Sequence, residues 1–575
     1  VLEKKDNPQN ILLVAITRMG DMLQASPTIA GLKTQYPNAR LTVVIDRTFA
    51  AICEGIPGID EIYALDLSFM VRAMAREGEG IVEAYKYFDK IVADLKGKNF
   101  DYVLNMSSSP YTAILLKILN IADSRGWMAD EEGNRLITNP WALLFAAFIF
   151  HSNRDYNGIN LVDIFRCAAG VTEHPRTLRY EPKPEDITWA KTFLATQLPA
   201  GDGPILYVQA GASQAKRQWS PKRFADLVKI LVDRFNARVV FVGAMGEKHI
   251  VDAIGALYTH PNVVSALGLT TFGQLAALFR CGDLLITGDT GPMHLSVAVG
   301  KPVVAVFLAS ALCYETGPYG PGNIVVQPQI SCNPCNPNYP CSRPDCHDQV
   351  SPELVAELVQ MRLDCPSEKD GEMKLPESIA GITDAAIYIT EFDDDGFLAF
   401  KRLGGGKERR GTAIEFFEGT REAYKALWKE EFEGIAASVM NGERSNILAA
   451  NEHPALAGLA SAVELAQEGI LALSKLQQLV KDPNGSPQLM RDLNVALHAI
   501  DHHIEDVGLA SPPIGGLIRV FLMEKENIRG ADIIELANNS AELYRSLIRR
   551  SVRFCEIFSK VAPAPANNPL RVLPS

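Results

Sequence analysis

The stretch ILLVAITRMGDMLQASPTIAGLK, residues 11–33, decides the fold of the first part of the chain. It begins as a continuous apolar run and continues with apolar residues at helical spacing, so it predicts a buried strand followed by a helix. Pro27 falls in the first turn of this helix, where a missing N–H group costs nothing. One carboxylate, Asp21, lies at the joint beside Gly20. An acid there is either a helix-capping residue or part of a site.

The same alternation of apolar runs and helical patterns continues to about residue 170, with strand-like runs such as LTVVID, EIYALD and YVLNMS. Such alternation is typical of βαβ units on a parallel sheet. After a polar, proline-bearing stretch near residues 174–186 the pattern begins again, with PILYVQAGAS, ARVVFVGAMGE, NVVSALGL, DLLITGDTG and PVVAVFLA. The sequence therefore predicts two successive α/β halves with a cleft between them, and ligands in such folds bind at the carboxyl ends of the strands.

The last 200 or so residues differ from this pattern. AAIYITEFDDDGFLAFKRLGGG predicts a β-hairpin, and four long segments after it carry apolar residues at spacings of three and four, which indicates packed amphipathic helices. The expected domains are residues 1–180 and 181–370 for the two halves, 371–409 for a hairpin and linker, 410–562 for a helical bundle, and 563–575 for a disordered tail.

The net charge of -12 excludes a general nucleic-acid binder, which needs a basic footprint. The first ten residues are polar and carry no apolar leader, so we expect a cytoplasmic protein. The most apolar run, WALLFAAFIF from Trp141 to Phe150, is well short of the about 20 residues of a membrane span. It predicts a buried helix; a helix lying against a membrane or a lipid acceptor is the alternative.

Three loops at predicted strand ends of the second half carry groups suited to phosphate and sugar. In GDTGPMHL a strand ends and a helix begins, so free N–H groups and the helix dipole face the cleft. A helix cap with a packed histidine is the plainer interpretation of this segment. In QAGASQAKRQWSP small residues precede two adjacent cations, which suits a pyrophosphate. In FVGAMGEKH, Gly243 lacks a side chain and so allows an adenine to approach, and Glu247 can accept a hydrogen bond from a ribose hydroxyl. The candidate residues are Gly211, Ser213, Lys216, Arg217, Gly243, Glu247, Asp289, Thr290, Gly291 and His294.

Neither a P-loop spacing nor a G-x-G-x-x-G follows the first strand, so a kinase or a dinucleotide dehydrogenase is poorly supported. Instead ILLVAITRMGDMLQASPTIAGLK, GASQAKRQWSPKRFADLV and ITGDTGPMHLSVAVGKPVVAVF resemble, over about residues 11–360, the recurring blocks of glycosyltransferase family 9, the ADP-heptose:lipopolysaccharide heptosyltransferases. The resemblance implies a GT-B fold, with an acceptor domain followed by a nucleotide-sugar domain. It also implies transfer with inversion and no metal in catalysis.

The family's motifs map onto single residues of this chain. The resemblance assigns Asp21 as the general base, Lys216 as a phosphate ligand, and Asp289, Thr290, Gly291 and His294 as the D-T-G-x-x-H block. A base for the acceptor hydroxyl and positive charge for the leaving diphosphate are what a direct displacement needs. On the acceptor side, Arg18 is a candidate for contact with acceptor phosphates, and Gly20 for a close approach of the acceptor.

Cys332, Cys335, Cys341 and Cys346 form C-x2-C-x5-C-x4-C in a loop rich in Pro and Asn, residues 332–346. This spacing allows a tetrahedral thiolate site for structural zinc or iron, and related protein heptosyltransferases carry a cysteine-bound iron. Reduced free thiols and a disulfide are the alternatives. Four protein ligands leave no open position, so a catalytic metal is not expected.

The sequence thus predicts an inverting glycosyltransferase that moves a heptose, or a related sugar, from an ADP-sugar to a hydroxyl of a lipopolysaccharide core or another glycan. A protein acceptor of the adhesin or flagellin type is one alternative, and a non-catalytic binding or assembly module is another. Peripheral contact with the inner face of the cytoplasmic membrane, and oligomerisation through the helical bundle, are further expectations; nucleic acid is not expected as a partner.

Overall fold

The computed structural model describes residues 7–16, 18–148, 151–365, 373–382, 384–404, 413–435, 456 and 458–561. By its contacts the chain forms two compact units. The first unit is Val1–Arg135 with Asn160–Gly406, and the second is Leu136–Ile159 with Lys407–Ser575. Each unit is therefore built from two separate segments of the chain.

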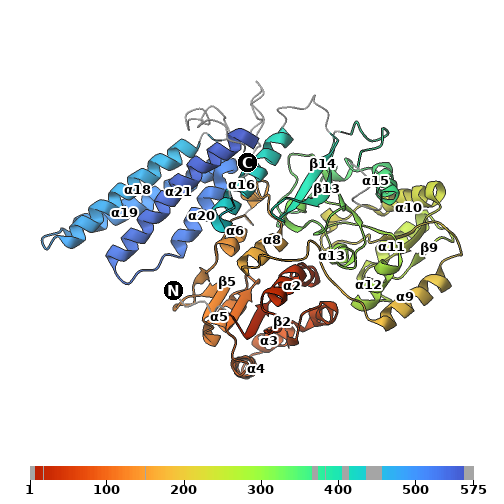
Figure 1. The fold of residues 1–575 in the computed structure, drawn as a ribbon, viewed down its shortest axis with the longest axis horizontal. Coiled ribbons are helices and arrows are strands. Elements are labelled where there is room, and N and C mark those ends of the chain that lie inside the picture. Colours follow the sequence, from red (N-terminus) through yellow and green to blue (C-terminus); the bar gives the residue numbers. More distant parts are fainter. Residues whose placement is uncertain are drawn as a thin grey trace. The chain divides into compact units, whose positions relative to one another are not determined.

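The first of two sheets has six strands in the order β3-β2-β1-β4-β5-β6. Two of these strands, β2 and β5, are labelled in Figure 1. Its central strand β1 pairs in parallel with both β2 and β4, and Ile11, Leu12, Leu13 and Val14 are completely buried. A central parallel strand is covered on both faces, which is why this run carries no polar residue. The strands are β1 (Asn10–Val14), β2 (Arg40–Asp46), β3 (Glu61–Leu65), β4 (Tyr102–Asn105), β5 (Asp123–Ala129) and β6 (Arg135–Ile137).

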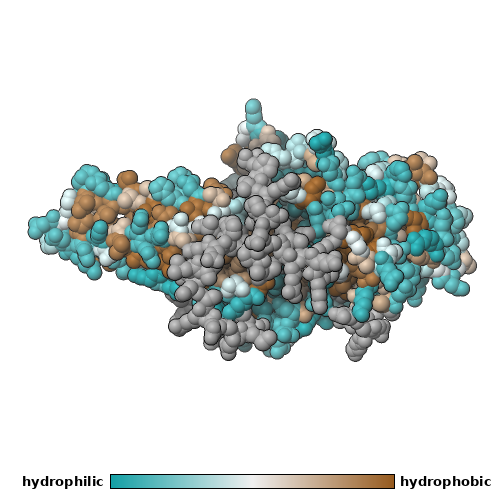
Figure 2. Space-filling view, turned by 90° about the horizontal axis from the view of Figure 1, so that it is seen from above, coloured by the Kyte–Doolittle hydropathy of each residue, from teal (hydrophilic) through white to brown (hydrophobic). Residues whose placement is uncertain are grey.

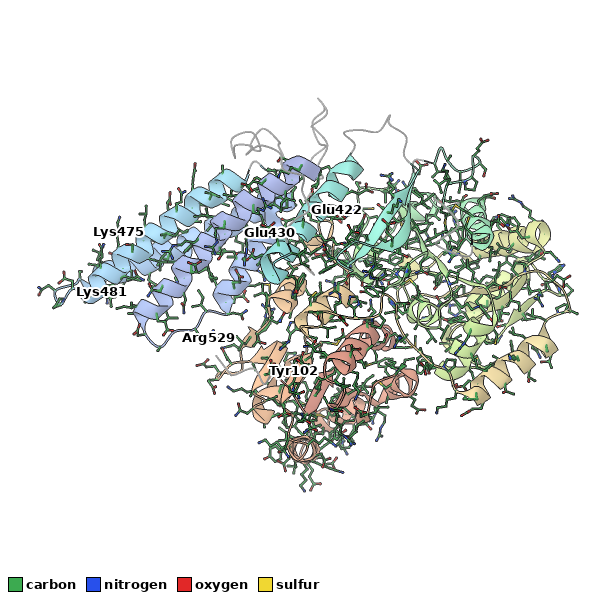
Figure 3. All side chains as sticks on the ribbon, viewed as in Figure 1. Tyr102, Glu422, Glu430, Lys475, Lys481 and Arg529 are labelled. Carbon is green, nitrogen blue, oxygen red and sulfur yellow. The ribbon has the colours of Figure 1, made fainter. Side chains whose placement is uncertain are left out.

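Helices connect and cover these strands. They are α1 (Met19–Gln24), α2 (Ser26–Gln35), the 3-10 helix η1 (Arg47–Gly55), α3 (Leu67–Met74), α4 (Gly80–Lys96), α5 (Pro110–Leu119) and α8 (Leu161–Ala168), while α9 (Pro184–Gln197) precedes the second sheet. Pro27 lies in the first turn of α2, as predicted. On β4 the hydroxyl of Tyr102, labelled in Figure 3, donates to the carbonyl of Ala169 after α8 (2.9 Å). The segment that follows α8 is thereby tied to the first sheet.

The second sheet has eight strands in the order β14-β13-β12-β11-β10-β7-β8-β9. β7 to β12 pair in parallel, and the predicted hairpin of β13 and β14 continues the sheet because β13 pairs antiparallel with β12 (Ile324 opposite Ile389). The strands are β7 (Ile205–Val208), β8 (Arg238–Phe241), β9 (Val263–Ser265), β10 (Leu284–Thr287), β11 (Val303–Val306), β12 (Ile324–Pro328), β13 (Ala385–Phe392) and β14 (Leu398–Leu403). The strand order around β7 repeats that around β1.

The helices of this half follow the same alternation. They are η2 (Ala215–Arg217), α10 (Pro221–Phe235), η3 (Met245–Glu247), α11 (Lys248–Leu257), α12 (Phe272–Cys281), α13 (Gly291–Ala298), α14 (Cys313–Thr316), η4 (Asp345–His347) and α15 (Pro352–Asp364). α10 packs against α11 and α15, and α12 packs against α9. The buried core of the half lies between α10, α15 and the strands.

The second unit is helical. It contains α6 (Pro140–Phe148), α7 (His151–Arg154), α16 (Ala413–Glu433), α18 (Gly458–Lys481), α19 (Pro487–Ala510), α20 (Pro512–Glu526) and α21 (Ile533–Val561). α18 packs against α19 and α21, and Arg550 of α21 bridges Glu431 and Glu524 at 2.6 Å from each. Glu430, which precedes Glu431 on α16, is labelled in Figure 3 and forms an ion pair with Arg553 at 2.8 Å.

The apolar run from Trp141 forms α6, and most of its side chains are buried within the second unit. Trp141 packs edge-on against Phe432, and Phe148 against Tyr424. The interpretation of the run as a buried helix is confirmed for residues 141–148, while residues 149 and 150 lie outside the described residues. Among the helices that the structure describes, none combines the length and the hydropathy of a membrane span.

The predicted fold class is confirmed: two Rossmann-like halves are followed by a mainly helical region. The domain limits remain predictions, and the expected tail at 563–575 falls outside the described residues. Leu136–Ile159 groups with the C-terminal helices, which the sequence pattern did not indicate.

Figure 2 shows apolar side chains exposed among polar ones over the helices at its left, and Leu471, Val495 and Leu509 are exposed by 62%, 68% and 66%. Self-association through these helices likewise remains a prediction.

A buried carboxylate holds three parts of the first unit together. Asp163 on α8 is 0% exposed. It accepts hydrogen bonds from Arg166 Nε (2.8 Å), from the Tyr319 hydroxyl (2.9 Å) and from the backbone N–H of Leu398 on β14 (2.9 Å). The carboxylate therefore connects α8 with the loop before β12 and with the hairpin.

Replacing Asp163 with Ala should lower the free energy of unfolding by about 3–5 kcal/mol, because it leaves the buried Arg166 guanidinium without its counter-ion. Chemical denaturation followed by tryptophan fluorescence measures this change. Asp226→Ala is the matched control, since Asp226 forms an exposed pair with Lys222 on α10 and should cost less than about 1 kcal/mol. Equal losses in the two variants would contradict the role given to Asp163.

Candidate active site

The joint between β1 and α1 carries the acceptor-side residues predicted from the sequence. Arg18 precedes α1 in an extended conformation and is exposed, whereas Gly20 and Asp21 lie in the first turn of α1 and are partly buried. A carboxylate in a first helical turn interacts favourably with the helix dipole. The structure therefore places Asp21 at the carboxyl end of the central strand, where α/β folds bind ligands.

The matching joint of the second half lies between β10 and α13. Thr290 precedes α13 in an extended conformation, so the N–H groups of the first turn of this helix point out of the strand end. Asp289 accepts from Arg217 Nη1 (3.1 Å) and from the Thr316 hydroxyl (3.0 Å). Arg217 Nε also donates to the Ser310 hydroxyl (2.9 Å). Asp289 thus orients the Arg217 guanidinium beside the start of α13.

These two joints meet. A Cβ built on Gly20 would lie 3.1 Å from Cδ2 of His294 and 3.8 Å from Cα of Gly291, and a Cβ on Gly291 would overlap the methyl group of Met19. α1 and α13 are in contact over this region. The structure therefore brings Gly20, Gly291 and His294 together, and Asp21 follows Gly20 in the same helix turn.

His294 is buried at this contact, with 4% of its surface exposed. Burial lowers its pKa to about 4, so the imidazole is neutral at physiological pH. Its Nδ1 has no hydrogen-bond partner within the described part of the chain. His294 therefore acts here as a packed neutral ring, and it provides no positive charge for a phosphate.

The loops after β7 and β8 meet through Gln209, a residue that the sequence analysis did not single out. Its side chain is 3% exposed, and its Nε2 donates to Glu247 Oε1 (3.0 Å). The hydroxyls of Thr287 and Thr290 both lie 3.2 Å from its Oε1. The signal in the sequence was its place directly after a predicted strand and before the small-residue loop.

Glu247 lies over two glycine backbones. A Cβ on Gly211 or on Gly243 would overlap the carboxylate of Glu247, and Ala244 donates its backbone N–H to Glu247 Oε2 (3.0 Å). Burial raises the pKa of Glu247, while the bonds from Ala244 and Gln209 oppose that rise. The two glycines therefore make room for an acid rather than face open space. Ser213, on the same loop as Gly211, is exposed.

Lys216 contacts the cysteine-rich loop. Its Nζ donates to the backbone carbonyls of Asn336 (2.8 Å), Pro337 (3.2 Å) and Tyr339 (2.8 Å). His347 Nε2 donates to the carbonyl of Lys216 (2.8 Å). An ammonium has three N–H donors, so each of them has a carbonyl partner in this arrangement. The predicted phosphate role of Lys216 remains a prediction.

The ten cysteines of the chain are free thiols, and all of them lie within the described residues. Cys332 and Cys341 are exposed, Cys335 is partly buried and Cys346 is buried. Burial raises the pKa of the Cys332 thiol and of the Cys346 thiol. Over the described residues, no three His, Cys, Asp or Glu side chains are placed to hold a metal ion. The expectation of structural zinc or iron at Cys332, Cys335, Cys341 and Cys346 remains a prediction.

A cavity of about 900 Å³ lies elsewhere in the first unit, between α15 and the β13–β14 hairpin. Arg362, Glu391 and Lys401 are among the residues that line it. None of the predicted site residues lines it, because the acceptor-side and nucleotide-side residues lie at the carboxyl ends of β1, β7, β8 and β10 and the four cysteines lie in the loop 332–346. The strand ends therefore remain the candidate site.

The geometry combines a carboxylate on one Rossmann-like half with an oriented arginine, a helix start and a glutamate on the other. Two such halves that meet at the carboxyl ends of their central strands have the arrangement of the GT-B fold. Residues 89–344 match the family model described as glycosyltransferase family 9 (heptosyltransferase). This match, together with the heptosyltransferases among its relatives, supports a family 9, heptosyltransferase-like glycosyltransferase.

Curated relatives match about half of the chain. A putative glycosyltransferase of Haemophilus influenzae is 25% identical over 321 residues, which cover 52% of this chain and 82% of the relative. The lipopolysaccharide core heptosyltransferase OpsX of the same organism is 24% identical over 304 residues, which cover 52% of this chain and 79% of that relative. Among solved structures, the E. coli ADP-heptose LPS heptosyltransferase II is 16% identical, with a TM-score of 0.46, and covers 62% of this chain and 99% of that one.

The contact between Met19 and Gly291 can be tested by a double-mutant cycle. Gly291→Ala alone should lower the free energy of unfolding by about 1–3 kcal/mol, because its Cβ meets the Met19 methyl group. In a Met19→Ala background the same change should cost almost nothing. Thermal unfolding of the four proteins measures the coupling, and Gly201→Ala, with no atom near its Cβ, is the control. Additive effects would show that the two residues do not touch.

The buried His294 predicts a loss of stability in acid. Its pKa is lower in the folded chain than the usual 6.5, so the folded state binds fewer protons, and its stabilising effect is lost as pH falls from about 6.5 toward 4. Between pH 7 and pH 4.5 the wild type should lose about 2–3 kcal/mol more than His294→Gln, in denaturation curves recorded at both pH values. Identical losses would mean that His294 titrates normally.

Proposed function

We propose that the chain transfers a heptose, or a related sugar, from an ADP-sugar to a hydroxyl of a lipopolysaccharide core or another glycan, with inversion at the anomeric carbon. The observation that carries this proposal is the contact between the β1–α1 joint, which holds Asp21, and the start of α13, which lies beside Arg217. The names of the relatives, which include lipopolysaccharide heptosyltransferases, support the choice of sugar and acceptor.

In the proposed reaction Asp21 accepts the proton of the acceptor hydroxyl. The hydroxyl oxygen then forms a bond to the anomeric carbon, and the bond from that carbon to the diphosphate oxygen breaks with its electron pair. ADP leaves carrying that negative charge. Because one displacement occurs from the face opposite the leaving group, the configuration inverts. A positioned base of this kind contributes about 10²–10⁴-fold to the rate.

Positive charge for the leaving diphosphate comes first from Arg217 and from the N–H groups at the start of α13. Arg217 is held by Asp289 and Ser310, so little side-chain entropy remains to be lost on binding. Lys216 joins them by exchanging at least one of its carbonyl partners for a phosphate oxygen. These groups meet the charge of the diphosphate, so we propose that transfer requires no metal ion.

The acceptor of this proposal is a lipid-linked glycan, which implies peripheral contact with the inner face of the membrane. The exposed Arg18, beside Asp21, is placed to meet an anionic group of such an acceptor. Self-association through the helices of the second unit is a separate part of the proposal, and the oligomeric state in solution tests it.

The decisive experiment compares the wild type with Asp21→Asn. Purified protein is given ADP-heptose and a deacylated lipopolysaccharide core, and release of ADP is followed with and without the acceptor. Asp21→Asn should reduce the acceptor-dependent rate by about 10²–10⁴-fold, because it removes the base. The affinity for ADP should stay unchanged, since Asp21 does not touch the nucleotide in this proposal.

Glu79→Gln, on an exposed turn before α4, is the matched control and should keep full activity. The anomeric configuration of the product, read by NMR, tests the inversion. If no sugar nucleotide is turned over by the wild type, the proposed function is wrong. Full activity in Asp21→Asn would remove Asp21 from the mechanism but keep the enzyme.

A further inference from the structure

Gln209 makes a hydrogen bond at each end of its amide, in a buried position. The Nε2 end donates to a carboxylate oxygen of Glu247 at 3.0 Å, and the Oε1 end lies 3.2 Å from each of the Thr287 and Thr290 hydroxyls. The two hydroxyls also lie 3.0 Å from each other. The backbone N–H of Gln209 donates to the carbonyl of Ile286 on β10 (3.0 Å). One side chain thus connects the carboxyl ends of β7, β8 and β10.

The charge of Glu247 determines which way this amide points. An amide group offers donors on nitrogen and acceptors on oxygen, and an ionised carboxylate only accepts. With the amide reversed, its oxygen would face the carboxylate, and its NH₂ group would face the two hydroxyls. The observed orientation gives each hydroxyl an acceptor and gives the carboxylate a donor. Glu247 and Thr290 are therefore coupled through Gln209, although they are 43 positions apart in the chain.

Glu247 keeps capacity for a ligand in this arrangement. A carboxylate has about four lone-pair sites. One oxygen of Glu247 accepts from Gln209 and the other from the backbone N–H of Ala244. The residue is only partly buried, so further lone pairs reach the space outside the strand ends. A vicinal diol such as that of a ribose is a ligand whose two hydroxyls can donate to such a carboxylate.

We propose that Gln209 is a positioning residue that gives the nucleotide site its preference for a ribose over a deoxyribose. It does so by holding the Glu247 carboxylate toward the ribose hydroxyls while it holds the Thr290 hydroxyl at the start of α13. Gln209 touches neither the sugar nor the reacting atoms. This inference rests on the proposed function, in which the second half binds an ADP-sugar.

The experiment measures the dissociation constants of ADP, 2′-deoxy-ADP and 3′-deoxy-ADP by calorimetry on the full chain. Wild type should bind ADP at least about 10-fold more tightly than one of the deoxy analogues, the value expected for a hydrogen bond to a charged group. In Gln209→Leu this ratio should fall to near one, because the carboxylate is no longer held. A residue that only supports the fold would weaken all three ligands equally and leave the ratio unchanged.

Gln327→Leu is the matched control. Gln327 on β12 is also a buried glutamine bonded at both ends, to the N–H of Cys313 and to Asn333, so its loss reports the general cost of removing such a side chain. In Gln327→Leu the ratio of the dissociation constants of the deoxy analogues to that of ADP should equal the ratio in the wild type. Thermal unfolding of Gln209→Leu and Gln327→Leu measures how much stability each variant loses.

Gln209→Glu gives a second readout, because a protonated carboxyl can still donate to Glu247. Two carboxyls at hydrogen-bond distance share one proton at low pH and repel each other once both are ionised. The preference for ADP should therefore persist in this variant at low pH and decline as pH rises, while the wild type shows no such decline.

Two results separate the inference from the proposed function. If wild type discriminates against a deoxy analogue and Gln209→Leu keeps the same ratio, Gln209 does not position Glu247 and the inference is wrong, while the nucleotide site stands. If wild type binds ADP but does not discriminate, the inference is again wrong. If wild type binds no ADP, the proposed donor is wrong and the inference falls with it.

Discussion

The absence of side chains at Gly20 and Gly291 is the constraint on which the site depends. In each Rossmann-like half a central strand is followed by the N-terminus of a helix, α1 after β1 and α13 after β10. These two helix N-termini approach closely because a glycine, without a Cβ, lies at the point of contact on each. A Cβ at Gly291 would meet Met19, and one at Gly20 would press on His294. This close approach brings the helix turn that carries Asp21 against the start of α13, so the candidate site contains residues of both halves.

Within the second half the polar groups are held by one another before any ligand arrives. Asp289 holds Arg217, and Gln209 holds Glu247 together with Thr290. Side chains fixed in this way lose little conformational entropy when a ligand binds. They are also already oriented to stabilise the charge that develops in a transition state. Lys216 follows a different rule, since its partners are backbone carbonyls of the cysteine-rich loop. The position of that loop therefore determines what the ammonium can reach.

The strands and the helix starts could be predicted because their signals are local. Continuous apolar runs such as ILLV and LLIT, each ending in a glycine-bearing turn, predicted β1 and β10 and placed Asp21 and Asp289 at strand ends. The role of Gln209 could not be predicted, because its partners are 38 and 81 residues away. Nor could the partners of Lys216, since every residue carries a carbonyl and only the fold selects Asn336 and Tyr339. The metal expected from the four close-set cysteines remains a prediction, since over the described residues no three His, Cys, Asp or Glu side chains are placed to hold one.

The two-segment origin of the helical unit has a consequence for synthesis on the ribosome. Trp141 and Phe148 of α6 pack against aromatic residues of α16, which is made much later. Between Ile159 and Lys407 lie 247 residues, so at about 5–20 residues per second the partners of α6 are made roughly 10–50 s after it. During that interval the apolar run Trp141–Phe148 lacks the side chains that cover it in the folded unit. The nascent chain thus passes through a state whose surface a chaperone can recognise.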